Sequence, residues 1–258
     1  MSMNEKYSIL KTLQQSSKGS VYIAQNNSQI NESHKTVIIK TFYKVKSNYF
    51  VKDENSSVII PKELYFINLI KDKTLSPLII DSYCESDRFA IVMEHLCGDW
   101  VDLYDYAERK ITENIIKKIF INVVNALENL SNQGIYHLDV KPENIMVNKK
   151  TLQIKILDFE DALEDNNIFP QCDKLVGTGG FIAPEVFLGN QYDVKKSLVF
   201  TLGCFLYSCI ETDNPNIDNN NFKYKRSTKP AQKFIQKCIK KHPKDRIDFH
   251  KILLEPFL

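Results

Sequence analysis

The segment His137-Leu-Asp-Val-Lys-Pro-Glu-Asn144 decides the fold class and the chemistry of this chain. Fourteen residues after Asn144, at the end of a strand-like run, comes Asp158-Phe-Glu160. The two segments offer the residue types that transfer of a phosphoryl group needs. These are a carboxylate to accept a hydroxyl proton, an amide oxygen and a carboxylate to hold magnesium, and a lysine to meet charge on the phosphate. A surface loop rich in Asp, Lys and Pro is the alternative explanation, and the other motifs argue against it.

Both segments resemble the catalytic loop and the magnesium-binding motif of eukaryotic-type protein kinases, and the resemblance covers essentially all 258 residues. It implies that Asp139 is the catalytic base and that Lys141 steadies the transferred phosphate. It also implies that Asn144 and Asp158 are the magnesium ligands. A lysine two residues after the catalytic aspartate is similar to the serine/threonine class. The resemblance therefore implies an ATP- and Mg²⁺-dependent kinase that phosphorylates serine or threonine hydroxyls of proteins.

Upstream, Val37-Ile-Ile-Lys40 resembles the strand whose lysine holds the α- and β-phosphates of ATP, and Glu63 lies where the helical partner of that lysine is expected. Such a pair fixes a flexible ammonium group in a partly dry cleft, where charges interact more strongly than in water. Met93 precedes Glu94-His-Leu96, which resembles the hinge that meets the adenine, and Met93 is expected to limit the depth of that pocket. The nucleotide contacts implied by the resemblance are Gly19, Val21, Ile38, Lys40, Met93, Glu94, Leu96, Asp102 and Met146.

Downstream, the run Gly177-Thr-Gly-Gly-Phe-Ile-Ala-Pro-Glu185 resembles the end of a kinase activation loop. Arg246 resembles the arginine that pairs with the glutamate of this run, an ion pair that supports the lower lobe. Thr178 resembles the threonine that contacts the catalytic aspartate and lysine. The implied catalytic set is Lys40, Glu63, Asp139, Lys141 and Thr178.

The loop that is expected to cover the nucleotide departs from the family pattern. Gln14, Ser16 and Gly19 stand where the family has three glycines. A backbone that carries side chains cannot approach phosphates as freely as glycine can. We therefore expect weaker or slower nucleotide handling, with Gly19 the least dispensable of the three.

Other departures concern activation. Residues 159–176 contain no Ser, Thr or Tyr, and Leu138 replaces the arginine that usually receives a loop phosphate. These two absences predict constitutive activity. Glu160 replaces a glycine, which predicts a stiffer magnesium loop. Leu198 replaces an aspartate that braces the catalytic loop in many kinases, and this change predicts weakened activity.

Hydrophobic periodicity divides the chain into a strand-rich first third and a helical remainder. Strands are expected at 7–24, 35–45, 77–95, 145–147 and 153–157. Helices are expected at 63–70, 114–130 (with Thr112 as cap), 194–211, 230–240 and 247–254. The predicted fold is α+β, a bilobal protein kinase fold in one domain over 1–258, with a small β-rich N-lobe with one helix (1–95) and a larger helical C-lobe (96–258). Only 43 positions separate Gly203 from Arg246, so the usual substrate-docking helix is expected to be short or absent.

Composition gives no electrostatic pull toward nucleic acid or membranes, since 34 basic and 32 acidic side chains leave a formal charge of +2. Six cysteines without a C-x-x-C pair predict a reducing compartment. The first residues lack a secretory signal, and the longest apolar stretch, 198–210, is too short to span a bilayer. We therefore expect an intracellular protein of the cytoplasm or nucleus, with no membrane partner and no direct nucleic-acid site.

Two alternative functions stay open. A pseudokinase would keep the fold as a nucleotide-binding or scaffolding module without turnover, and Gln14, Ser16 and Leu198 are its best support. A small-molecule phosphotransferase would share the core, but such folds lack the Lys141-Pro-Glu pattern and the pairing of Glu185 with Arg246.

Short motifs and composition suggest which branch of the kinase family the chain resembles and which kind of organism encodes such a chain. Asp102-Leu-Tyr-Asp-Tyr and Pro61-Lys-Glu63 resemble the Pim and calmodulin-dependent branches. A compact chain rich in Asn, Ile and Lys resembles kinases of baculoviruses or poxviruses, and also those of AT-rich parasites. A viral protein of the baculovirus type would act in a host cell, and the resemblance implies a basic, arginine-rich protein substrate that Glu143 would face. The oligomeric state is unknown from sequence, and a homodimer stays open.

Overall fold

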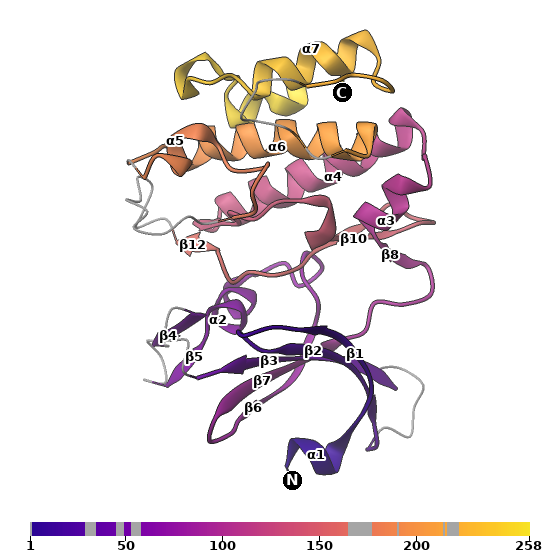
Figure 1. Cartoon of the computed structure of the whole chain (residues 1–258), viewed down its shortest axis with the longest axis vertical. Helices are drawn as coiled ribbons and strands as arrows, with labels where there is room; N and C mark the ends of the chain where they lie inside the picture. Colours follow the sequence, from indigo (N-terminus) through magenta and orange to yellow (C-terminus); the bar gives the residue numbers. More distant parts are fainter. Residues whose placement is uncertain are drawn as a thin grey trace. The chain divides into compact units, whose positions relative to one another are not determined.

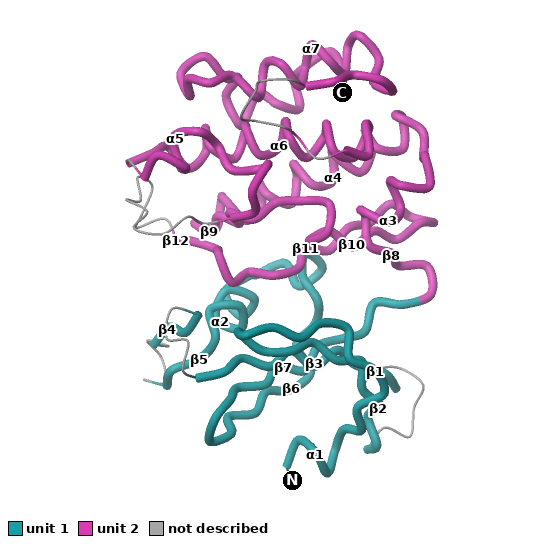
Figure 2. The backbone as a smooth tube through the Cα atoms, in the orientation of Figure 1, with its two compact units in different colours: residues 1–97 teal, residues 98–258 magenta. Residues whose placement is uncertain are grey.

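The computed structural model describes residues 2–28, 35–44, 49–52, 58–164, 177–189, 191–213, 215 and 222–258. The chain divides into two compact units, residues 1–97 and residues 98–258 (Figure 2). This division lies two residues after the lobe boundary expected from the sequence. Each unit is described separately.

The first unit is built on a five-stranded antiparallel sheet in the order β1-β2-β3-β7-β6 (Figure 1). Its strands are β1 (Tyr7–Gln15), β2 (Ser20–Asn26), β3 (Thr36–Tyr43), β6 (Ile79–Cys84) and β7 (Arg88–Glu94). The remaining elements are α1 (Met3–Lys6), the hairpin of β4 (Phe50–Lys52) and β5 (Ile59–Pro61), and α2 (Lys62–Leu69). The single turn α1 was not expected from the sequence, because four residues are too few to show a helical period.

Strand register assigns the side chains of this sheet to two faces. On β3, Val37 and Ile39 are buried in one hydrophobic cluster, whereas Ile38 packs against a second cluster that includes Met93. Because alternate residues of a strand point to opposite faces, Lys40 shares the face of Ile38. Val21 lies opposite Lys40, and Met93 lies opposite Ile38. One face of the sheet therefore carries four of the predicted nucleotide contacts.

The second unit is mainly helical, and its core surrounds α6 (Val194–Glu211). Nearly every residue of α6 is buried, which marks a helix enclosed on all sides. In Figure 1, α6 lies between α4 (Glu113–Ser131) and α7 (Lys229–Cys238), and it contacts both. Thr112 caps α4 as expected, since its side chain accepts a hydrogen bond from the Ile115 amide.

Short strands hold the catalytic-loop segment of the second unit. The sheet β11-β10-β8 and the pair β12-β9 flank residues 137–144 and 157–162. Their bounds are β8 (Trp100–Asp102), β9 (Ile135–Tyr136), β10 (Ile145–Asn148), β11 (Ile154–Ile156) and β12 (Leu163–Glu164). The shorter helices are α3 (Leu103–Glu108), α5 (Pro184–Phe187) and three 3₁₀ segments: η2 (Pro142–Asn144), η4 (Pro243–Asp245) and η5 (Phe249–Leu254).

The predicted fold class is confirmed, because a sheet-rich unit precedes a larger helical one. The helix expected at 247–254 is instead the 3₁₀ segment η5. Between α6 and α7 the described residues, 212–213, 215 and 222–228, contain no helix. The prediction of a short or absent substrate-docking helix also concerns residues 214 and 216–221, which lie outside the described residues. Among the described residues, no helix is both long and apolar enough to cross a bilayer.

Candidate active site

Four of the predicted site residues are joined by hydrogen bonds around the carboxylate of Asp139 in the second unit. Its Oδ2 accepts hydrogen bonds from Lys141 Nζ at 2.8 Å and from Asn144 Nδ2 at 2.9 Å. Its Oδ1 accepts one from Thr178 Oγ1 at 2.7 Å. Lys141 Nζ also donates to Thr178 Oγ1 at 2.6 Å. Four residues that the sequence placed in one site therefore share one hydrogen-bonded network, which fixes the direction of the Asp139 carboxylate.

Local structure brings these side chains together. Pro142 opens the 3₁₀ turn η2, which returns Asn144 toward Asp139. Asn144 Nδ2 donates both to the Asp139 carboxylate and to the Asp139 backbone oxygen, the latter at 2.8 Å. Because its two amide protons are used in this way, its Oδ1 points away from Asp139 and is oriented as an acceptor or a ligand.

Asp158 is held next to this cluster by backbone contacts. The Leu157 amide donates to Asn144 O at 2.8 Å. Asp158 itself has a φ of +60°, a left-handed conformation that non-glycine residues rarely adopt. Phe159 is fully buried and packs edge-to-face on His137, with ring centroids 4.8 Å apart. A strained conformation at a predicted magnesium ligand is the kind of feature that collects at functional sites.

His137 stabilises the same region as a neutral ring. Burial lowers its pKa. Its Nε2 lies 2.9 Å from the carbonyl oxygen of Leu157 and, because a carbonyl only accepts, Nε2 carries the proton. The histidine therefore links the catalytic loop to the strand end that leads into Asp158.

Asp102 and Met146 lie opposite each other in the register of β8 and β10. Asp102 caps α3, since its Oδ1 accepts from the amides of Tyr104 at 2.7 Å and Asp105 at 3.2 Å. Burial, and then the charges of Asp105 and Glu143, raise the pKa of Asp102 to about 6. The carboxylate predicted to contact nucleotide thus also has a structural role, and it lies in acidic surroundings.

In the first unit, Lys40 Nζ lies 2.6 Å from Glu63 Oε2, as the sequence predicted. The Glu63 side chain is only 3% exposed and the Lys40 side chain 14%. Glu63 occupies the first turn of α2, where the helix dipole favours a carboxylate. A nearly buried pair of this kind gives the lysine a fixed position on the sheet face that carries the predicted nucleotide contacts.

Gly19 is required for a reason that the sequence did not reveal. A Cβ at this position would overlap the carbonyl oxygen of Thr41 in β3, so the backbone itself allows only glycine. Ser16 closes the same turn: its amide and its hydroxyl both donate to Gly19 O, at 2.9 and 3.2 Å. The serine that replaces a family glycine therefore stabilises the β1–β2 turn through its hydroxyl.

The residues expected at the hinge lie at and beyond the end of β7. Met93 is 6% exposed and packs with Leu64 and Phe89 in the core of the first unit. The Glu94 carboxylate accepts from the Leu78 amide at 2.7 Å, and the Glu94 amide donates to Leu78 O. Leu96 is half-buried and lies outside any regular element. A role for Met93 in limiting the pocket stays a prediction, because its packing fits a core methionine equally well.

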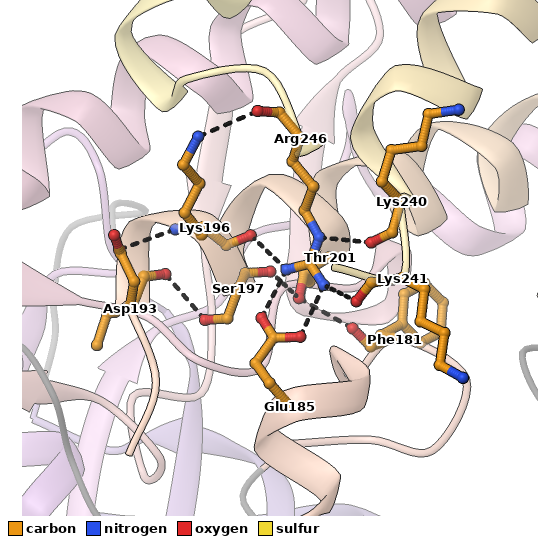
Figure 3. Close-up of polar contacts among 10 residues, drawn as sticks. Phe181, Glu185, Asp193, Lys196, Ser197, Thr201, Lys240, Lys241 and Arg246 are labelled. Carbon is orange, nitrogen blue, oxygen red and sulfur yellow. Dashed lines mark hydrogen bonds and ion pairs between the residues drawn. The ribbon is translucent and has the colours of Figure 1, made fainter. Parts of the chain in front are cut away.

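The predicted pair of Glu185 and Arg246 is present in the second unit and belongs to a larger cluster of polar contacts (Figure 3). Arg246 Nη1 and Nη2 donate to the two Glu185 oxygens at 2.6 and 2.7 Å. The guanidinium also lies 4.9 Å from the ring centre of Phe200. Its other three N–H groups donate to the backbone oxygens of Lys196, Lys240 and Lys241. All five donors of a completely buried side chain are satisfied.

Sequence reasoning missed two contacts at α6. Thr201 Oγ1 donates to Phe181 O at 2.9 Å and so attaches the segment after Thr178 to the helix. Leu138 and Leu198, each noted separately as a departure, line the same cavity. One sequence signal could have linked these two positions, since each of them has leucine where the family pattern has a charged residue.

Residues 165–176, on which the prediction of phosphorylation-independent activity depends, lie outside the described residues.

Comparison with known proteins assigns the chain to a family: it belongs to the protein kinase domain family, whose model matches residues 7–258. It is similar to the serine/threonine-protein kinase PSK2 of Saccharomyces cerevisiae, with 30% identity over 221 residues. That match covers 82% of this chain and 19% of PSK2. The chain thus spans about a fifth of the length of this curated relative.

Further relatives agree on the class. Human ULK1, a serine/threonine-protein kinase, is 26% identical over 79% of this chain and 21% of its own length. Mouse Nek5, also a serine/threonine-protein kinase, is 25% identical over 98% of this chain and 40% of its own length. These relatives are eukaryotic and do not support the viral type, and the Pim and calmodulin-dependent branches stay predictions.

Proposed function

We propose that the chain is an ATP- and Mg²⁺-dependent serine/threonine protein kinase. The observation that carries the proposal is the hydrogen-bonded network of Asp139, Lys141, Asn144 and Thr178. It presents a carboxylate fixed by three donors with an ammonium group beside it. This arrangement suits deprotonation of a hydroxyl next to a highly charged phosphate.

The residues divide the reaction between them. The substrate hydroxyl oxygen forms a bond to the γ-phosphorus while the bond to the β-phosphate oxygen breaks, and ADP leaves. The hydroxyl proton passes to the Asp139 carboxylate. Lys141, held between Asp139 and Thr178, offsets charge on the transferred group. Lysine in this place, with Thr178 beside it, supports serine and threonine as acceptors.

The donor set fits magnesium. Mg²⁺ prefers hard oxygen ligands, and Asp158 offers a carboxylate whereas Asn144 offers the amide oxygen that its bonded NH₂ group directs away from Asp139. When bound, the ion neutralises phosphate charge. The protein's own contribution is to orient these oxygens through the 3₁₀ turn at Asn144 and the left-handed backbone of Asp158.

In the first unit, the Lys40–Glu63 pair supports binding of the α- and β-phosphates. Val21, Ile38 and Met93 share the sheet face of Lys40 and supply apolar contacts for a base. We assign the remaining nucleotide contacts to the positions expected from the sequence: Gly19, Glu94, Leu96, Asp102 and Met146.

A basic protein substrate is the finer part of the proposal. Burial is the main cause of the raised pKa of Asp102, and the nearby charges of Asp105 and Glu143 add to it, so three acidic residues lie near one another. Glu143 Oε2 is buried and has no hydrogen-bond partner among the described residues. Such carboxylates favour arginine or lysine side chains in a substrate. The five described cysteines are free thiols, which supports the cytoplasm or nucleus as the location.

The test is transfer of labelled phosphate from ATP to basic and acidic peptide libraries in the presence and absence of Mg²⁺. We expect transfer to Ser and Thr of basic peptides only with Mg²⁺, and a loss of about 10²- to 10⁴-fold in Asp139→Asn. Asp99→Asn is the matched control, because Asp99 forms an exposed ion pair with Lys150. Protein that binds MgATP but transfers no phosphate would contradict the proposal and favour a pseudokinase.

Activity without loop phosphorylation belongs to the same proposal. Residues 159–176 offer no hydroxyl to modify, and Leu138 offers no cation to receive a phosphate. Protein made in bacteria and treated with phosphatase is therefore expected to keep its full specific activity in this assay.

A further inference from the structure

The catalytic loop and α6 meet at a small cavity of about 20 Å³ in the second unit. Leu138, which directly precedes Asp139, and Leu198 of α6 both line it. Leu198 is 3% exposed. The other lining residues come from the 177–189 segment, from Tyr192 and from α6, and three of them carry hydroxyl groups: Ile182, Ala183, Val186, Tyr192, Ser197 and Thr201.

Leu138 and Leu198 stand where the family pattern has charged residues, and neither leucine side chain can form a hydrogen bond at this junction. Within the part of the chain that the structure describes, no hydrogen bond joins α6 to residues 137–139. The bond from Thr201 goes to Phe181 instead. The catalytic loop therefore meets α6 through packing and not through a hydrogen bond, and the direction of its backbone at Leu138 depends on how well this contact is filled.

The backbone of Leu138 is also packed against the next segment. Gly177 has a φ of +98°, and a Cβ there would lie 3.1 Å from Leu138 O and 3.3 Å from Ile182. Thr178, the next residue, donates to Asp139. A shift of Leu138 would thus displace the Asp139 carboxylate and its Thr178 partner together.

We infer that Leu198 is a positioning residue for Asp139, acting through Leu138, and that the two leucines form a matched apolar support. This inference rests on the proposed kinase activity. It reverses the sequence-based expectation that Leu198 weakens the enzyme. A carboxylate at 198 would lie in a small cavity beside Leu138, and no lysine or arginine lines this cavity to pair with it.

The test compares three changes at 198 with a matched control on the same helix. Leu198→Ala should lower kcat about 10- to 100-fold, with the KM for ATP changed less than about twofold, because a small displacement of the base affects the chemical step. Leu198→Met, which conserves volume, should stay within about threefold of wild type. Leu198→Asp should lose activity at least as strongly as Leu198→Ala. Leu206→Ala removes the same atoms from a fully buried position away from the cavity and should leave kcat nearly unchanged when folded.

Hydrogen exchange supplies a readout besides activity. Amides of residues 136–141 should exchange several-fold faster in Leu198→Ala than in Leu206→Ala. If Leu198→Ala does not fold, Leu198→Val, which removes only one methylene, takes its place and should exchange faster at these amides than the wild type. Equal exchange and equal kcat in the two alanine variants, or higher activity in Leu198→Asp, would overturn the inference. An inactive wild type would instead refute the proposed function, and the exchange comparison would still decide the role of Leu198.

Discussion

Two segments of the second unit are attached to α6 in different ways. The segment that contains Glu185 is held by a buried ion pair, whereas the segment that contains Leu138 is held by packing. Glu185 is held by the buried Arg246, whose five N–H groups all have acceptors. Leu138 meets α6 at a small cavity that Leu198 also lines, without a hydrogen bond between the two segments among the described residues. Burying a charge is tolerable only when every donor is satisfied, whereas hydrocarbon needs only filled volume. The polar support is therefore expected to fail abruptly when one partner is lost, and the apolar one to weaken in proportion to lost volume.

The largest expected effect comes from breaking the polar support. Arg246→Met leaves the Glu185 carboxylate and three backbone oxygens without their donor, and we expect a loss of about 3–5 kcal/mol in the free energy of unfolding. Urea denaturation measures it. In a double-mutant cycle with Glu185→Met, the double variant should be less destabilised than the sum of the two single changes. Additive losses, or a loss below about 1 kcal/mol in Arg246→Met, would show that the cluster is not the support described.

A smaller effect is expected between the two regions, at Thr201. Thr201→Val keeps the shape but removes the donor to Phe181 O, which leaves a buried acceptor unsatisfied. We expect a cost of about 1–2 kcal/mol by urea denaturation. Ser208→Ala, a buried hydroxyl on the same helix, serves as control for the general cost of changing α6. The role given to Thr201 would be wrong if the two variants lost equal stability.

The smallest effect concerns Asp102. Its carboxylate is partly buried near other acidic residues, whereas the carboxylate of Glu185 is paired with an arginine. Its pKa is raised from 3.8 to about 6, with burial as the main cause. The folded chain therefore holds this proton more tightly than the unfolded chain, so its contribution to stability falls as pH rises from about 4 to about 6. Asp102→Asn still caps α3 but cannot ionise.

Thermal unfolding across this pH range checks the prediction. The stability of Asp102→Asn relative to wild type should increase between pH 4 and pH 7 by on the order of 1 kcal/mol, after allowance for solvent screening of a partly exposed group. A pH-independent difference between the two proteins would refute the raised pKa.

The sequence by itself determined those helices, and those contacts among the predicted catalytic residues, whose signals are local. Helical spacing and the capping Thr112 located α4 within one residue at each end. The segment 137–144 contains three of the four residues in the hydrogen-bonded network, Asp139 included, because one short loop and one 3₁₀ turn suffice to bring them together. The family pattern also paired Lys40 with Glu63 and Glu185 with Arg246, and both pairs are present.

Only the tertiary structure decided why other residues are needed. A Cβ at Gly19 would overlap the backbone of Thr41, and Leu138 lines the same cavity as Leu198, which is sixty positions away. Asp102 combines a cap with a raised pKa only because α3, β8 and the turn at Glu143 lie together. Caps, periods and loop motifs act over a few neighbouring residues, so sequence displays them directly. Steric limits, cavities and electrostatic environments arise from segments distant in the chain, so they appear only when packing brings those segments into contact.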